Sequence, residues 1–480
     1  MREAMFRESR YNIWVEHAGA FYVYNGISGA VLCVPGEDYR NLNRFLSNQQ
    51  QDNCSPALLT DLIRGRMLVT YDFDELKFLA ERYRLGRFDT QAFSLTIVTS
   101  LGCNFSCPYC FEAKHPSLMK EEVEHSVLEL LNEKLERIKQ FNVCWFGGEP
   151  LLGKRSLFRL SDEFIARCER RAVNYNANIL TNGYLLDKTT CAELRAHKVT
   201  DAQVTIDGPP KVHDRMRPLA DGRGNFWHIV RNLRHAIDYL NVSIRVNVDR
   251  HNFSVAGELL QILADEGFTG KLKVALGRIS GGENGGAPSK SYSKCSLTIP
   301  EYAQIEREFV DLAIRYGFAG VELPQPTAAP CTAVRSNELV VGSDGELYKC
   351  YQSVGNPAET IGNICNYRDL NGRLQKWLRY DPFANHECRK CIALPVCMGG
   401  CAQIAFDPIQ YENRCDTFRY SHKQQVERFV QITERLGNTG LTSVRQLARA
   451  SEPPIIPQAQ TSGERGFVRP AHPAASDGRD

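Results

Sequence analysis

The feature that most constrains the fold is the alternation of apolar, strand-like runs with helical periods from residue 91 to residue 281. The predicted strands are 94–99, 142–146, 178–180, 202–206, 243–248 and 271–277. The predicted helices between them are 120–138, 156–171, 189–197, 226–241 and 254–266. Strands separated by helices form a parallel sheet with right-handed crossovers. The sequence therefore predicts an α/β core.

The first 90 residues predict a separate, small α+β unit. Strand-like runs at 11–15, 21–24 and 30–34 precede helical segments at 37–46, 56–64 and 74–83. After the α/β core, the glycine-rich stretch 281–289 and a helix at 299–316 form a linker over 282–325. A second cysteine field and a helix at 417–436 occupy 326–436. The segment 451–480 is rich in proline and predicts a disordered tail.

The chain contains seventeen cysteines and has a formal net charge of +2. Disulfides are rare in the reducing cytoplasm, so clustered cysteines are interpreted as ligands. Residues 1–10 are polar and charged, with no apolar core of signal-peptide length, and no apolar run approaches the length needed to span a membrane. A near-neutral charge gives no general attraction to nucleic acid or to an anionic membrane. We therefore expect a cytoplasmic protein with neither of these partners.

Three cysteines, Cys103, Cys107 and Cys110, lie in one short loop directly after the first predicted core strand. Three thiolates bind only three irons of a four-iron cubane, which leaves one iron open. A structural zinc ion is the alternative, with His115 as the nearest fourth ligand. The spacing, with Tyr109 before the last cysteine, resembles the radical S-adenosylmethionine (SAM) enzymes, whose open iron binds SAM. The resemblance implies a partial (β/α)6 barrel.

Further motifs fit this resemblance and predict the SAM site. Gly147, Gly148 and Glu149 match the family's Gly-Gly-Glu-Pro motif, in which glycines allow close backbone approach and Glu149 or nearby carbonyl groups accept the SAM ammonium hydrogens. Asn182 and Thr205 end predicted strands, where such folds present binding groups. Arg217, in a His-Asp-x-x-Arg-Pro run, either pairs with the SAM carboxylate or braces its loop. Asn247 is a weaker candidate.

The second cysteine field resembles the SPASM domain, which carries two auxiliary clusters. The resemblance implies that the outer cluster is held by Cys388, Cys391, Cys397 and Cys415. It assigns the inner cluster to Cys331, Cys350 and Cys401. The missing inner ligand is Cys365, a side chain other than cysteine, or a substrate thiol. A pair of zinc knuckles is the alternative, but only one Cys-x2-Cys pair occurs.

The resemblance implies a peptide maturase that uses a 5′-deoxyadenosyl radical to remove hydrogen from a ribosomally made precursor peptide, giving an oxidised or cross-linked product. It implies SAM and three [4Fe–4S] clusters as cofactors and a flavodoxin- or ferredoxin-type electron donor. The N-terminal unit is similar to the peptide-recognition domains of such maturases, with a simple lid or scaffold as the alternative.

Other functions remain open at this point. Sulfatase-maturing relatives, which form formylglycine, carry an aspartate directly after the second SPASM cysteine, whereas this chain has Tyr351. Peptide cross-linking of the pyrroloquinoline-quinone type is not separated by these motifs. A non-catalytic iron–sulfur redox protein leaves the open site without a purpose. A tRNA-modifying radical enzyme is disfavoured by the lack of a basic tract.

Overall fold

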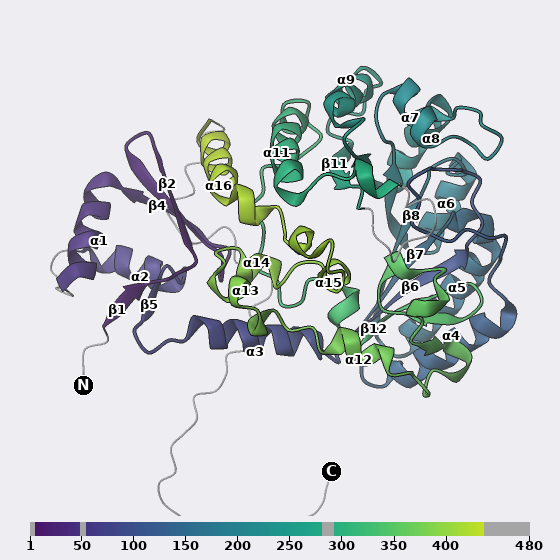
Figure 1. The fold of residues 1–480 in the computed structure, drawn as a ribbon, viewed down its shortest axis with the longest axis horizontal. Helices are drawn as coiled ribbons and strands as arrows, with labels where there is room; N and C mark the ends of the chain where they lie inside the picture. The colour runs from purple at the N-terminus through teal and green to yellow at the C-terminus, as the bar shows by residue number, and fades with distance from the viewer. Residues whose placement is uncertain (1–4, 49–53, 281–291, 436–480) are drawn as a thin grey trace, which may run out of the picture.

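The computed structural model describes residues 5–48, 54–280 and 292–435. Three regions follow one another across the molecule (Figure 1). The N-terminal unit lies at one end and the α/β core at the other, and the cysteine-rich C-terminal region lies between them. The predicted loop 281–289 and tail 451–480 lie outside the described residues.

The core is a parallel sheet of six consecutive strands, as the alternating pattern predicts. The strands are β6 (Ala92–Ser100), β7 (Gln140–Gly147), β8 (Asn174–Thr181), β9 (Val199–Thr205), β10 (Asn241–Val248) and β11 (Leu272–Arg278). Each strand pairs in parallel with its successor in the chain. The α/β prediction is confirmed.

Helices cover the outer face of this sheet. They are α4 (Glu121–Leu135), α5 (Lys154–Arg170), α6 (Lys188–Ala196), α8 (Phe226–Tyr239) and α9 (Ala256–Asp265). The shorter helix α7 (Pro210–Met216) lies between β9 and α8 in the chain. Alternate strand residues such as Phe141, Val143 and Trp145 are buried in one core with the helices. The residues between them face the inside of the curved sheet, and there β10 carries Arg245 and Asn247.

The C-terminal region extends the same sheet. β12 (Glu338–Val341) pairs in parallel with β6, and β13 (Glu346–Tyr348) and β14 (Gly362–Asn363) continue it in antiparallel fashion. The sequence analysis did not predict this extension, because the three strands are short and come from a region dominated by cysteines. The predicted helices at 299–316 and 417–436 correspond to α11 (Ile299–Arg315) and α16 (Phe418–Arg435).

The N-terminal unit contains an antiparallel sheet of β2 (Asn12–His17), β3 (Ala20–Asn25) and β4 (Val31–Pro35) in that order. One face packs against α16, through Ile13, Val15, Phe418 and Val426. The other face packs against α1 (Gly36–Asn48) and α2 (Pro56–Arg64). The sheet is therefore covered on both faces, and one of its covers comes from the far end of the chain.

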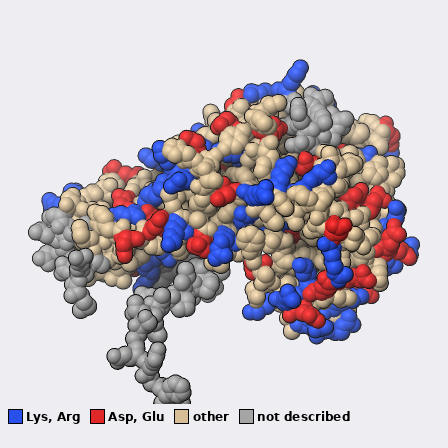
Figure 2. Space-filling view, turned by 60° about the horizontal axis from the view of Figure 1, so that its bottom comes forward, with Lys and Arg blue, Asp and Glu red and all other residues tan. Residues whose placement is uncertain are grey.

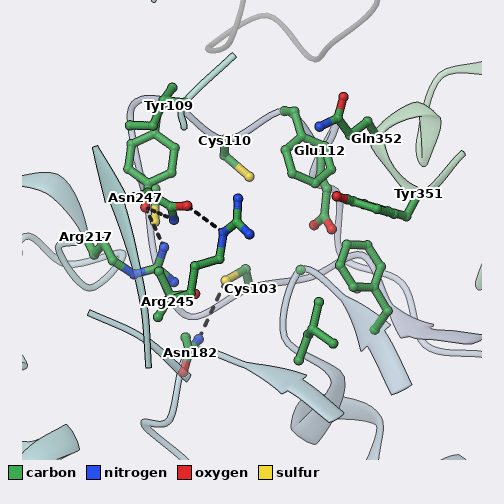
Figure 3. A pocket seen from close by; sticks show the side chains of 18 of the residues that line it. Cys103, Tyr109, Cys110, Glu112, Asn182, Arg217, Arg245, Asn247, Tyr351 and Gln352 are labelled. Atoms are coloured by element: carbon green, nitrogen blue, oxygen red, sulfur yellow. Dashed lines mark hydrogen bonds between the residues drawn. The ribbon is translucent and has the colours of Figure 1, made fainter. Parts of the chain in front are cut away.

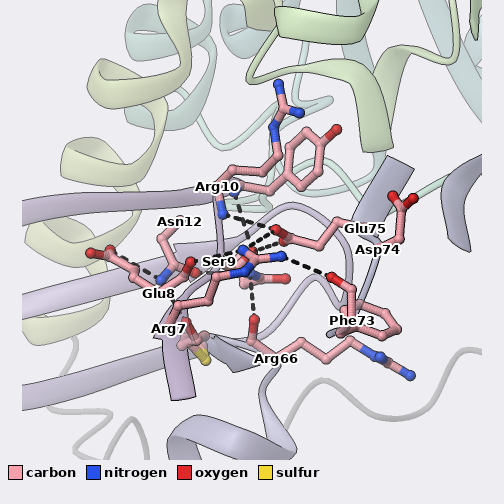
Figure 4. Close-up of polar contacts among 12 residues, drawn as sticks. Arg7, Glu8, Ser9, Arg10, Asn12, Arg66, Phe73, Asp74 and Glu75 are labelled. Carbon is pink, nitrogen blue, oxygen red and sulfur yellow. Dashed lines mark hydrogen bonds and ion pairs between the residues drawn. The ribbon is translucent and has the colours of Figure 1, made fainter. Parts of the chain in front are cut away.

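A buried carboxylate joins the remaining pieces of this unit. The short strands β1 (Phe6–Glu8) and β5 (Leu68–Thr70) form a pair, and α3 (Glu75–Arg87) begins at Glu75. Glu75 is 2% exposed and accepts hydrogen bonds from Arg7 Nη1 at 2.7 Å and Ser9 Oγ at 2.5 Å (Figure 4). A buried carboxylate that is paired and hydrogen-bonded stabilises the fold instead of destabilising it.

The surface carries a mixture of charges. On the face shown in Figure 2, lysine and arginine side chains are interspersed with aspartate and glutamate. Such a mixture agrees with the small net charge of +2. Among the described residues, no helix combines the length and apolarity that crossing a membrane requires.

Candidate active site

The three cysteines of the 103–110 loop border a cavity at the carboxyl ends of the core strands. The cavity is lined from every side by residues far apart in the sequence. The cysteine loop contributes Cys103, Cys107, Tyr109 and Cys110; strands β7 to β10 and the residues directly after them contribute Gly147, Gly148, Asn182, Thr205, Arg245 and Asn247; the end of α7 contributes Arg217; the cysteine-rich region contributes Tyr351 and Gln352. Six of the seven predicted SAM-contacting residues therefore lie on one cavity.

The cysteine loop is fastened by backbone hydrogen bonds to the segment that follows α7. Ser106 N donates to Pro218 O at 2.9 Å, and Ala220 N donates to Asn104 O at 2.9 Å. Between these bonds, Phe105 is buried and forms a β-bridge with Leu219. These two hydrogen bonds and the β-bridge fix the position of the loop that carries the thiols.

Gly147 and Gly148 let the backbone of β7 approach the start of the cysteine loop. Gly147 has φ +136°, and a Cβ on Gly148 would lie 2.5 Å from Gly102 O. Gly148 N donates to Ser100 O at 3.0 Å. The two glycines therefore allow β7 to pack closely against the backbone of residues 100–102, and they also leave bare backbone facing the cavity.

Glu149 is the predicted residue that does not border the cavity. It is fully buried, and its carboxylate accepts hydrogen bonds from Leu151 N at 3.1 Å, Thr181 Oγ1 at 2.8 Å and Asn182 N at 2.8 Å. Burial raises the pKa of Glu149, while these donors lower it. Glu149 holds the end of β8, and through it Asn182, whose Nδ2 donates to Asn104 Oδ1 at 2.7 Å.

A second polar network lies on the opposite wall (Figure 3). Tyr109 OH donates to Asp207 Oδ2 and accepts hydrogen bonds from Arg217 Nη1 at 2.6 Å and Asn247 Nδ2 at 3.3 Å. Asp207 is fully buried, and its Oδ1 accepts from Asn247 N at 2.9 Å. The aromatic residue of the cysteine motif is therefore fixed by its hydroxyl group.

The loop thiols lie among positive groups. Burial and the carboxylate of Glu112 raise the pKa of Cys110 to about 12, while the ammonium group of Lys114 acts to lower it. Lys114 also lowers the pKa of Cys103, against the larger effect of burial. Cationic neighbours favour thiolates, the form that binds iron. The buried Nε of Arg217 has no hydrogen-bond partner among the described residues.

The cysteines of the C-terminal region fall into two groups. Burial raises the pKa of Cys350, and the nearby thiols of Cys401 and Cys331 raise it further. Burial raises the pKa of Cys397 to about 12, with further contributions from Asp416, Cys415 and Cys391, and Cys388 interacts with Cys415 and Cys391. These are the same two sets that the resemblance assigns to two clusters.

Cys365 is exposed, on the short turn η8 (Ile364–Asn366), which contacts α4 on the outer face of the core.

The described residues contain no group of three histidine, cysteine, aspartate or glutamate side chains arranged to hold one metal ion. Each cluster thiolate binds a different iron, so cluster ligands need not converge on one point. The donor set of three thiols beside a cavity with cationic neighbours fits an iron–sulfur cluster with an open iron.

Several cavity residues were not predicted from the sequence. Arg245 and Gln203 alternate with buried apolar residues on β10 and β9, so the two-residue strand period could have identified them. Glu112, Lys114 and Gln352 follow cysteines in irregular segments, and no periodicity predicts where such side chains point.

Known proteins identify the core of this chain. Residues 97–261 match the model of the Radical SAM superfamily. An uncharacterised protein of Archaeoglobus fulgidus is 26% identical over 67% of this chain and 77% of its own length. The serine-type anaerobic sulfatase-maturating enzyme of Klebsiella pneumoniae is 22% identical over 62% and 78%, and the cysteine-type enzyme of Clostridium novyi is 22% identical over 63% and 85%.

Solved structures agree with the fold. The structure described as native anSMEcpe with bound AdoMet and Cp18Cys peptide has a TM-score of 0.53 and 20% identity, and the alignment covers 71% of this chain and 99% of that one. Another structure, of native anSMEcpe with bound AdoMet, has a TM-score of 0.52 over the same shares. At this identity the similarity establishes the architecture.

Proposed function

Because the chain is a radical SAM enzyme with a cysteine-rich C-terminal region of the SPASM type, we propose that it is a peptide maturase. Its substrate is a ribosomally made precursor peptide, and its product is oxidised or cross-linked. The observation that carries this proposal is the single cavity bordered by the cysteine loop, the core strand ends and residues of the cysteine-rich region. A substrate in this cavity meets both the radical source and the auxiliary domain.

The cofactors of the proposed reaction are SAM and [4Fe–4S] clusters. When bound, SAM and its cluster supply a 5′-deoxyadenosyl radical that removes a hydrogen atom from the substrate. Cys103, Cys107 and Cys110 would hold this cluster. Cys331, Cys350 and Cys401 would hold the inner auxiliary cluster, and Cys388, Cys391, Cys397 and Cys415 would hold the outer one. The auxiliary clusters would accept the second electron of an oxidation.

The protein's contribution is to orient SAM and to exclude water. Gly147 and Gly148 offer bare backbone, Asn182 offers an amide held by Asn104, and Thr205 offers a hydroxyl group. Arg217 supplies a guanidinium group beside the tyrosine of the cysteine motif. Its unpartnered Nε supports a role toward a ligand as well as a bracing one, because buried N–H groups rarely remain unpaired.

The N-terminal unit is proposed to receive part of the peptide. In the described residues β4 pairs only with β3, so it forms an edge of its sheet. Edge strands bind extended peptides by adding a strand, which is a common mode of peptide recognition. The unit packs against the cysteine-rich region through an apolar cluster that contains Tyr11 and Leu394, and Tyr24 OH donates to Pro324 O, directly before that region, at 2.6 Å.

A sulfatase-maturing activity is the second candidate, supported by the similarity to the two sulfatase-maturating enzymes. The aspartate expected of such enzymes after the second SPASM cysteine is replaced by Tyr351. Tyr351 lines the cavity and packs against Phe111 and Phe146. A phenol in aromatic surroundings is a poor proton acceptor, and this favours the maturase over the sulfatase-maturing enzyme.

The electron that starts the reaction is proposed to come from a flavodoxin- or ferredoxin-type donor in the cytoplasm. A reducing compartment keeps seventeen cysteines available as thiolates and suits oxygen-sensitive clusters.

The function is tested by incubating the reconstituted, reduced enzyme and SAM with each short peptide encoded beside its gene. We expect one peptide to lose a pair of hydrogens while 5′-deoxyadenosine forms in proportion, as measured by mass spectrometry. A synthetic sulfatase peptide serves as the comparison. Conversion of its cysteine or serine to an aldehyde, without reaction of any neighbouring peptide, would favour the second candidate.

A further inference from the structure

Arg245 projects its guanidinium group into the cavity from the middle of β10 (Figure 3). Its Nε donates to Asn247 Oδ1 at 2.8 Å, which fixes the plane of the group. The described residues contain no carboxylate within ion-pair distance of it, whereas Arg217 lies 4.0 Å from Asp207. The terminal nitrogens of Arg245 are therefore available to a ligand.

Gly277 makes room for this guanidinium group. On β11, Gly277 lies directly opposite Asn247. A Cβ at this position would lie 2.4 Å from Arg245 Cζ and 2.4 Å from its Nη2. A side chain at position 277 would displace the guanidinium group of Arg245. The absence of a Cβ on Gly277 therefore provides the space that this guanidinium group occupies.

The positive charge of Arg245 is not used by the thiols of the cysteine loop. Lys114 interacts with Cys103 and Cys110, and Arg217 interacts with Cys107. Arg245 instead interacts with Tyr351, on the wall formed by the cysteine-rich region, and with Asp207. Both oxygens of Asp207 already accept hydrogen bonds, from Tyr109 OH and Asn247 N.

Arg278, at the end of β11, adds a second guanidinium group to the side of the cavity that carries Arg245. Its Nη1 donates to Leu297 O at 2.9 Å and its Nη2 to Asn413 O at 3.4 Å, so it too lacks a carboxylate partner among the described residues. Among the described residues, Glu112 is the one carboxylate that lines this cavity; it lies beside the cysteine loop, where the ammonium group of Lys114 lowers its pKa against the larger effect of burial. The part of the cavity near β10 and β11 thus has an excess of positive charge.

We propose that Arg245 binds a carboxylate of the peptide substrate. A partly buried guanidinium group gains most from a planar, bidentate partner, and a carboxylate matches its fork of donors. The site lies between the residues proposed for SAM on β8 and β9 and the wall that contains Tyr351, where the reacting part of a substrate would lie. The carboxylate belongs either to an Asp or Glu side chain or to the peptide C-terminus. The inference rests on the proposed function.

The test is binding to the reconstituted, SAM-loaded enzyme, without reduction. Two random hexapeptide libraries serve as probes: one is acetylated and amidated, so that Asp and Glu carry its only carboxylates, and the other has a free C-terminus. Mass spectrometry counts the peptides that the immobilised enzyme retains. If the enzyme retains Asp- or Glu-containing peptides from the capped library, the bound carboxylate belongs to a side chain. If it retains peptides only from the library with a free C-terminus, the bound carboxylate is that of the C-terminus.

We expect the wild type to retain carboxylate-bearing peptides about tenfold or more over their amide counterparts, because hydrogen bonds to charged groups have that strength. Arg245→Gln should abolish the preference, and Arg245→Lys should keep only part of it. Gly277→Ala should also reduce it, since its methyl group displaces the guanidinium group. The matched control is Arg155→Gln, which removes an arginine that is 88% exposed.

An unchanged preference in both Arg245→Gln and Gly277→Ala would overturn the inference. So would a tenfold loss of SAM affinity in Arg245→Gln with the peptide preference intact, because the carboxylate would then be that of the cofactor. Retention of no peptide by the wild type would overturn the peptide substrate itself. Failure of the proposed function alone would appear instead as peptides that bind in this test but are not modified when the enzyme is afterwards reduced.

Discussion

At the scale of single residues, the carboxylate of Glu149 is occupied by hydrogen bonds within the protein. The sequence places this carboxylate after two glycines at a strand end, and the pattern predicts that Glu149 or nearby carbonyl groups contact the SAM ammonium group. The structure instead surrounds both carboxylate oxygens with donors from the chain itself, including Thr181 and Asn182. The motif could not reveal this, because Thr181 and Asn182 lie at the end of the next strand and meet Glu149 only in the folded sheet.

Glu149→Gln should destabilise the protein by about 1 to 3 kcal/mol. The glutamine NH2 group would replace one carboxylate oxygen and would face a hydrogen-bond donor of the protein, so that donor would lose its acceptor. The free energy of unfolding in denaturant measures this effect. Glu129→Gln, on the exposed side of α4, is the matched control and should change little. Equal stability of the two variants would show that the three hydrogen bonds to Glu149 contribute nothing net.

His213 is a buried neutral imidazole. Its Nδ1 accepts a hydrogen bond from Asp207 N at 3.2 Å, so its Nε2 carries the proton and donates to Asn225 Oδ1 at 2.9 Å. Burial and, to a smaller extent, the charge of Arg217 lower the pKa of His213 to about 4. Protonation of Nδ1 would place its new N–H group opposite the N–H group of Asp207, so the folded state disfavours the charged imidazolium.

This histidine predicts a stability that falls with acidification. Below its unfolded pKa of about 6.5, the unfolded chain binds a proton that the folded chain excludes until about pH 4, so stability is lost as the pH falls through this window. Between pH 7 and 5.5 the wild type should lose about 1 kcal/mol more than His213→Gln. Parallel loss in both proteins, measured by denaturant unfolding, would assign the acid sensitivity to other groups.

At the scale of elements, the contact between β7 and the cysteine loop decides where the thiols lie. Gly148→Ala should push Gly102 and the loop away, because the added methyl group meets a backbone oxygen and has no flexible side chain to displace. We expect loss of iron from the loop, with the auxiliary iron retained. Gly372→Ala, where the added Cβ meets nothing within 4 Å, is the control. Full iron content in Gly148→Ala would contradict this role.

The elements differ in how far the sequence predicts them. The six core strands were identifiable because each is an apolar run between helical periods, and α11 has a capping box from Thr298 to Glu301 that marks its start. The short strands β1, β5 and β12–β14 were not, since runs of two to four residues have no measurable period. The cavity followed the same rule: residues in the motifs were found, and Arg245 was missed.

At the scale of the whole molecule, α3 joins the N-terminal unit to the rest. Arg87, the last residue of α3, is 7% exposed and donates from Nε to Val334 O at 3.0 Å and from Nη2 to Leu378 O. Both acceptors belong to the cysteine-rich region. One side chain therefore connects the N-terminal unit to the segment that carries Cys331.

Arg87→Ala should leave these buried carbonyls without donors and lower the stability by about 2 kcal/mol. We expect faster tryptic release of the N-terminal unit, followed by gel electrophoresis over time. Arg84→Ala, an exposed position on the same helix, is the matched control. Release at the same rate from both variants would show that other contacts hold the unit in place.

The central claim is that one chain combines a SAM-cleaving cluster with two auxiliary clusters. The direct measurement is iron content and 5′-deoxyadenosine yield of the anaerobically reconstituted, reduced enzyme, in the wild type, a Cys103/Cys107/Cys110→Ala variant and a Cys33→Ala control. We predict about twelve irons in the wild type and control and about eight in the triple variant, with deoxyadenosine lost only there. A fully iron-loaded wild type that forms no deoxyadenosine, or a triple variant that still does, would contradict the account.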